Sequence, residues 1–185
     1  HWTRTNIRFD QMSKEFALIG CAWAPETVYD PATGRMMIYF TMRFGNEQNR
    51  LYYVYVNQDF NRIESIPQIL FEYPSGASAI DGDITPIWNE ERQKKDYHLF
   101  YVAHESGSGI KQAVSDRIDG SYRFDPRWID FEPVACEAPN VWKRIGEDKW
   151  VLMYDIFGIN PHNFGFVETS DFVHFKNLGR FNEGV

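Results

Sequence analysis

Residues 138–154, APNVWKRIGEDKWVLMY, decide the fold because they combine a short strand, a polar turn and an apolar strand. Two earlier pairs of segments share this pattern, Ala24–Tyr29 with Met36–Thr41 and Thr85–Trp88 with Tyr97–Val102. Prolines at positions 25, 86 and 139 align the three units, with spacings of 61 and 53 residues. Self-similarity at such a period indicates a repeated structural unit.

A third apolar segment follows each unit and ends in a polar turn: Leu51–Val56, Ile110–Val114 and Gly165–Thr169. The stretches 66–71 and 127–131 are predicted to be fourth strands of the first two units. No segment has a sustained helical period of about 3.6 residues. Four antiparallel strands that recur in this way are typical of a β-propeller blade. We therefore predict an all-β fold of the β-propeller type; a β-sandwich is the alternative, but it requires no repeated unit.

Three blades do not close a ring, because propellers have about four to eight. We therefore expect residues 1–185 to be about three blades of a single, larger propeller domain, with its first and last blades missing. On this expectation, residues 1–4 are the tail of a preceding blade and residues 181–185 lead into the next one.

Composition excludes several classes of protein. The 19 Lys and Arg residues are outnumbered by 26 Asp and Glu, which gives a net charge of −7, and no cationic block is present to bind nucleic acid. No apolar run approaches the roughly 18 residues of a membrane span. Aromatic residues make up 17% of the chain, which suits β-strands and also flat ligands such as sugars. The two cysteines, Cys21 and Cys136, fall in different units, so we expect free thiols.

Propeller geometry predicts where side chains gather. The first strand of each blade begins at the same rim at which the second strand ends. The starts of first strands contribute Trp23, Glu26, Asp81, Asp83 and Glu137, and the ends of second strands contribute Arg43, Phe44, His104, Glu105, Asp155 and Phe157. Hydrolysis of a glycosidic bond needs one carboxylic acid and one carboxylate, and crowding or burial raises a carboxyl pKa. No Cys/His spacing indicates zinc.

Three motifs at these strand starts resemble successive blades of glycoside hydrolase family 43: Cys21–Glu26 (CAWAPE), Ala79–Asp83 (AIDGD) and Cys136–Arg144 (CEAPNVWKR). The resemblance covers essentially the whole chain as three central blades. It implies a five-bladed propeller that cleaves glycosides with inversion. The family's substrates are mostly arabinofuranosides, xylosides and related sugars, and some members are galactosidases.

The resemblance also assigns roles to residues. Glu137 in Glu-Ala-Pro matches the general acid, although Ala138 stands where Gly is common. Asp81 matches the residue that tunes the pKa of the acid, but Gly82 replaces a proline, which leaves Asp83 as a rival. Trp23 and Glu26 match the motif that lines the sugar pocket. The general base belongs to the first blade of the family, which we expect to lie outside this chain.

The remaining candidates rest on rim position. His104, Asp155, Phe157 and Arg43 are predicted to bind substrate. Structural alternatives exist for several candidates: Glu137 could pair with Lys143 or Arg144, Asp81 could be a turn residue, Trp23 could pack between blades, His104 could be a buried histidine, and Arg43 could neutralise Glu26. His162 lies in a polar loop that could reach the rim, and loop polarity explains it equally well.

The sequence thus predicts an inverting glycoside hydrolase that acts on plant-type or related saccharides. One alternative is a retaining, β-fructosidase-like propeller; another is a non-catalytic carbohydrate-binding propeller. A phosphorylase is disfavoured because no cationic cluster is present for phosphate. The expected partner is a carbohydrate substrate. No cofactor or metal is required by this chain, and a central calcium ion in the complete domain is compatible with the resemblance. Secretion or a periplasmic location is compatible with such a substrate; the sequence fixes neither location nor oligomeric state.

Overall fold

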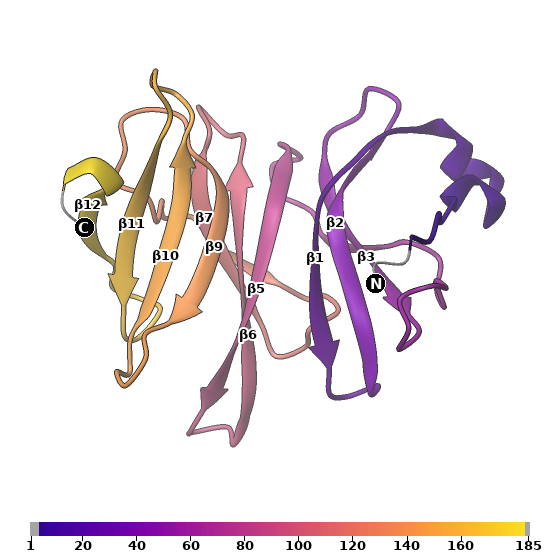
Figure 1. Ribbon diagram of the computed structural model, residues 1–185, viewed down its shortest axis with the longest axis horizontal. Helices are drawn as coiled ribbons and strands as arrows, with labels where there is room; N and C mark the ends of the chain where they lie inside the picture. Colours follow the sequence, from indigo (N-terminus) through magenta and orange to yellow (C-terminus); the bar gives the residue numbers. More distant parts are fainter. Residues whose placement is uncertain (1–3, 184–185) are drawn as a thin grey trace.

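Three four-stranded antiparallel sheets make up the β-structure in the computed structural model, which describes residues 4–183 (Figure 1). The first contains β1 (Ile19–Asp30), β2 (Arg35–Phe44), β3 (Arg50–Val56) and β4 (Gln68–Phe71). The second contains β5 (Ala79–Asn89), β6 (Lys94–Ala103), β7 (Gly109–Ser115) and β8 (Arg123–Asp125). The third contains β9 (Glu137–Lys143), β10 (Trp150–Ile156), β11 (Asn163–Thr169) and β12 (Lys176–Arg180). Each sheet pairs its strands in chain order, as predicted for propeller blades.

The hairpin turns follow from local side-chain chemistry. At the end of β1, the Asp30 carboxylate accepts the Ala32 N–H at 2.9 Å and the Thr33 hydroxyl at 2.7 Å. Gly34 then adopts a φ of 70°, which few other residues tolerate, and β2 begins. The β1–β2, β5–β6 and β9–β10 hairpins all lie at the lower end of the molecule in Figure 1.

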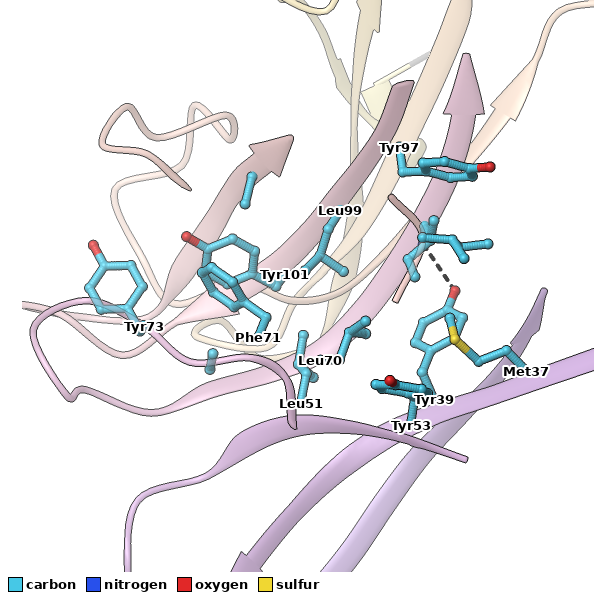
Figure 2. Close-up of a cluster of buried hydrophobic side chains, with 14 of the residues drawn as sticks. Met37, Tyr39, Leu51, Tyr53, Leu70, Phe71, Tyr73, Tyr97, Leu99 and Tyr101 are labelled. Atoms are coloured by element: carbon cyan, nitrogen blue, oxygen red, sulfur yellow. Dashed lines mark hydrogen bonds between the residues drawn. The ribbon is translucent and has the colours of Figure 1, made fainter. Parts of the chain in front are cut away.

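Aromatic and aliphatic side chains fill the two interfaces between neighbouring sheets. Between the first and second sheets, the ring centroids of Phe71 and Tyr101 are 4.6 Å apart (Figure 2). The Tyr39 hydroxyl accepts the N–H of Ile84 across this interface at 2.9 Å. A second cluster, which includes Phe100 and Tyr154, fills the interface between the second and third sheets. Much of the aromatic content therefore serves packing between blades.

The face of the first sheet that points away from the second is covered by the N-terminal segment. This segment contains two short 3₁₀ helices, η1 (Phe9–Gln11) and η2 (Lys14–Leu18). Phe9 stacks on Phe40 of β2 with ring centroids 5.5 Å apart. A third 3₁₀ helix, η3 (Phe181–Glu183), follows β12. Within residues 4–183, no helix is both long and apolar enough to cross a membrane.

The fourth strands match the sequence prediction only in part. The stretch 66–71 contains β4, as predicted, but the prediction for 127–131 was wrong, because β8 is the three-residue strand Arg123–Asp125. The chain after β8 turns back to the start of β7, where Ile129 donates its N–H to the Ile110 carbonyl at 2.8 Å. The corresponding strand of the third sheet, β12, was not predicted.

The three inner strands contain the same irregularity, which corrects the alignment of the repeat. Positive φ angles of 47°, 53° and 52° occur at Ala24, Asp81 and Ala138, at intervals of 57 residues. Each lies where the pairing with the next strand shifts register. We call these positions the mouth bulges. The alignment through Pro86 was therefore wrong: Pro86 lies in the regular part of β5, and Gly82 is the counterpart of Pro25 and Pro139.

The structure contains three four-stranded sheets, as the repeat predicts. The expectation that the ends of the chain connect to further blades falls partly outside the described residues, because residues 1–3 and 184–185 are not described. It stays a prediction.

Candidate functional site

The predicted site residues lie at one end of the three sheets. Here β1, β5 and β9 begin and β2, β6 and β10 end, at the top of Figure 1. We call this end the mouth. The mouth bulges lie along it, and bulges of this kind re-aim side chains and are common near active sites.

Hydrogen bonds at the mouth connect the three blades. The Asp81 N–H donates to the Thr41 hydroxyl of the first blade at 3.0 Å. The Asp81 carboxylate in turn accepts the Ala138 N–H of the third blade at 3.2 Å. Trp23 lies directly opposite Thr41 in the β1–β2 pair. The structure therefore brings Trp23, Asp81 and Glu137 together from three different blades.

Glu137 lies directly opposite Asp155 in the β9–β10 pair. Burial raises the pKa of Glu137 above its ordinary value, and the charges of Asp81 and then Asp155 raise it further, while His162 opposes them. The His162 Nδ1 lies 3.6 Å from an oxygen of Asp155. A carboxyl group in this setting keeps its proton to a higher pH than an exposed glutamate does, as a general acid must.

Glu137 is not held in the ion pairs that were the structural alternative for it. Lys143 pairs instead with Asp148 at 2.9 Å, and Arg144 pairs with Glu168 at 2.6 Å. The Glu137 side chain is half-buried at the mouth.

Asp81 and Asp83 have different surroundings. Asp81 is half-buried, and burial raises its pKa, which the Ala138 N–H and the charge of His104 oppose. Asp83 is buried, and its carboxylate accepts the Val141 N–H at 2.8 Å and the Thr85 hydroxyl at 3.3 Å. Burial raises the pKa of Asp83 to about 6. Asp83 therefore joins β5 to β9 below the mouth. Asp81 lies at the mouth, beside the first residues of β9.

Trp23 is exposed rather than packed between blades, and the Arg43 guanidinium lies 5.6 Å from the centroid of its ring. The Arg43 Nε is buried without a hydrogen bond to any part of the chain that the structure describes. Glu26 lies beyond the bulge, opposite Tyr39, and the carboxyl group whose pKa it raises is Asp83. The structure thus places Trp23 with Arg43, and places Glu26 farther along the strand.

The other rim candidates follow the ends of second strands. His104 comes directly after β6 and is exposed, so it is not the buried histidine of the alternative interpretation. Phe157 comes directly after β10 and is half-buried. The Glu105 carboxylate pairs with Lys111 at 2.9 Å and also accepts the Tyr73 hydroxyl.

Sequence reasoning missed Thr41. The signal that could have found it is its position two residues before Arg43, which places it on the same face of β2. Within residues 4–183, no three His, Cys, Asp or Glu side chains are grouped to hold a metal ion. Cys21 and Cys136 are free, as predicted.

Comparison with known proteins identifies the family to which this chain is related. A family model described as a probable glycosyl hydrolase domain, related to glycoside hydrolase family 43, matches residues 1–183. The chain belongs to this family. No curated protein matches it.

Several solved structures have a fold similar to that of this glycosyl hydrolase domain. A thermostable family-43 glycoside hydrolase has 14% identity and a TM-score of 0.61, with 85% of this chain and 58% of that one covered. An endo-arabinase from Bacteroides thetaiotaomicron has 13% identity and a TM-score of 0.60, with coverages of 78% and 55%. A family 117 glycoside hydrolase from Zobellia galactanivorans has 16% identity and a TM-score of 0.61, with coverages of 86% and 55%.

The chain spans between half and three-fifths of the length of these structures. Its three sheets resemble part of a five-bladed propeller, so the predicted fold class is confirmed.

Proposed function

We propose that this glycosyl hydrolase domain cleaves glycosidic bonds with Glu137 as the general acid. The observation that carries the proposal is the environment of Glu137, which is half-buried at the mouth with Asp155 opposite it. Asp81 and Asp155 both raise its pKa. A carboxyl group whose pKa is raised keeps its proton to a higher pH and can donate it to the oxygen of a leaving sugar.

The proposed mechanism is a single displacement with inversion. Glu137 protonates the leaving oxygen, and the negative charge of Asp81 favours the protonated form of Glu137 beforehand. Asp81 also hydrogen-bonds the sugar. A second carboxylate, about 6.5–9.5 Å from the acid in inverting enzymes, activates water on the opposite side of the sugar. We assign this base to a part of the propeller outside the residues described here.

The proposed substrates are arabinofuranosides, xylosides or galactosides of plant-type polysaccharides. Structures of similar fold include an endo-1,4-beta-xylanase from Bacteroides thetaiotaomicron and a GH62 alpha-L-arabinofuranosidase from Coprinopsis cinerea. Trp23 offers an exposed aromatic face to a sugar, and Arg43 and His104 offer donors to its hydroxyl groups. Phe157 and Glu26 extend this binding surface in the proposal.

The test is Glu137→Gln in the full-length protein. We expect kcat/KM to fall about 10²–10⁴-fold on glycosides with poor leaving groups, because general acid catalysis contributes that much. The loss should be much smaller on dinitrophenyl glycosides, whose leaving groups need no proton. Glu147→Gln, in the β9–β10 turn, is the matched control and should retain activity. Full activity of Glu137→Gln on a poor leaving group would refute the assignment.

The stereochemistry of the product separates the rival mechanisms. NMR of the freshly released sugar should show inversion at the anomeric carbon. Retention would instead favour the β-fructosidase-like mechanism, in which the two carboxyl groups lie about 5–5.5 Å apart. Saccharide binding without any turnover would favour the non-catalytic propeller.

A further inference from the structure

A hollow lies beside the strand that carries Glu137. It has a volume of about 380 Å³ and is lined by residues 106–109, by Trp128 and Asp130, and by residues 132–135. We call it the Trp128 hollow. Its two walls are the β6–β7 loop and the segment that leads into β9.

One wall of the Trp128 hollow is formed by the segment that leads directly into β9 at the mouth. Ala135 lines the hollow and lies two residues before Glu137. The Cys136 N–H donates to the Ser108 carbonyl at 3.0 Å, which fixes the start of β9 against the β6–β7 loop. The hollow therefore adjoins the start of β9, where Glu137 is the first residue.

Trp128 provides a fixed aromatic surface in this wall. Its side chain is 44% exposed, although the Lys111 ammonium lies 4.3 Å from the centroid of its ring. Lys111 itself is only 3% exposed, and it donates hydrogen bonds to the Tyr73 hydroxyl at 2.8 Å and to Glu105 at 2.9 Å. A cation held in this way orders the ring before any ligand arrives, which reduces the entropy lost on binding.

The polar groups of the hollow suit a neutral, hydroxyl-rich ligand. The Asp130 carboxylate accepts the Ile110 N–H at 2.7 Å and the Glu132 N–H at 3.2 Å, which orients its oxygens. The hydroxyl of Ser108 adds a polar group on the opposite wall, with a hydrogen bond of 3.4 Å to the Cys136 carbonyl. The lining contains no lysine or arginine, and Glu132 is paired with Arg180 at 2.7 Å, so the charge of Asp130 remains and disfavours anionic sugars.

We propose that the Trp128 hollow binds a second, neutral sugar unit of the same saccharide whose glycosidic bond lies at Glu137. The apolar face of that unit packs on Trp128, and its hydroxyl groups hydrogen-bond Asp130 and Ser108. The inference rests on the proposed function and narrows it: the substrate is an oligosaccharide or polysaccharide, recognised over at least two sugar units.

The test measures binding in a full-length Glu137→Gln background. Isothermal titration with xylo-oligosaccharides and arabino-oligosaccharides of one to six units should show affinity that rises with length. Trp128→Ala should weaken the affinity for the longer oligosaccharides about tenfold and so reduce the rise with length. Trp128→Phe should retain part of the rise. Trp88→Ala is the matched control, because Trp88 is also exposed but lies in β5 at the hairpin end, away from the mouth.

Activity provides an independent reading. With Glu137 intact, Trp128→Ala should keep its kcat/KM on glycosyl fluorides, which have one sugar ring and no second ring to enter the hollow, and lose it on oligosaccharides. A length dependence unchanged by Trp128→Ala, or affinity that does not rise with length in the parent, would overturn the inference. If Glu137→Gln stays fully active while Trp128→Ala loses the length dependence, the acid assignment fails and the hollow stands.

Discussion

Asp81 combines an unusual backbone conformation with contacts to both neighbouring blades. Its φ is 53°, in the left-handed region that Asp and Asn enter more readily than most residues. Its N–H donates a hydrogen bond to the Thr41 hydroxyl, and its carboxylate accepts the Ala138 N–H. These two bonds hold the carboxylate next to Glu137, so its charge acts on the pKa of that residue.

Asp81→Asn should move the basic limb of the kcat/KM profile to lower pH. The Asp81 charge raises the pKa of Glu137, so its removal lets Glu137 lose its proton at a lower pH. Asn tolerates the positive φ, and its side-chain oxygen can still accept the Ala138 N–H. Asp148→Asn, in the exposed β9–β10 turn, serves as the control. A limb that stays in place or moves to higher pH would contradict this role of Asp81.

The positions of individual residues at the mouth could be predicted where a short motif contains them, and their roles stay predictions. Glu137 and Asp81 are in the inner strands, where residue order matches the family. Thr41 and Trp128 come from other strands and loops, and their positions depend on how sheets pack and where the chain turns after β8. Neither depends on a local pattern, so sequence reasoning did not find them.

At the scale of strands, the first three of each sheet follow from apolar segments between polar turns. The fourth strands are short: β8 has three residues, and the side chains of β12 are exposed or half-buried. Their sequences therefore have little hydrophobic pattern. The repeat was misaligned because a proline marks the mouth bulge in two blades and Gly82 marks it in the third. Either residue type can accompany a break in regular pairing.

Substitution of Tyr39 tests how much one hydrogen bond between neighbouring sheets contributes to stability. Tyr39→Phe removes the acceptor of the Ile84 N–H and leaves that buried donor unsatisfied, which should cost about 1–3 kcal/mol in the free energy of unfolding. Tyr97→Phe, in the same cluster (Figure 2), makes a matched control because no hydrogen bond of its hydroxyl is seen within residues 4–183. Urea unfolding measures both variants. Equal stability of the two would show that the Tyr39 bond contributes nothing.

At the scale of the whole molecule, the middle sheet is packed on both faces. The segment 99–103 of β6 has no exposed surface, since alternate side chains enter the clusters on either side. We expect its amides to exchange with deuterium more slowly than those of any other strand described here, and those of β12 to exchange faster. Hydrogen-exchange mass spectrometry can measure this order. Faster exchange in β6 than in β12 would contradict the packing.

The mouth bulges have a consequence for how this domain can evolve. Immediately before each bulge stands one side chain, and the three blades place there an aromatic, an aliphatic and an acidic residue: Trp23, Ile80 and Glu137. The residue after each of these positions has a similar positive φ and lies at a shift in register, and the large buried clusters lie between the sheets. Mutation at Trp23 or Glu137, which are exposed and half-buried, can therefore alter chemistry or specificity while the architecture is inherited unchanged, whereas Ile80 packs in the cluster between the second and third sheets.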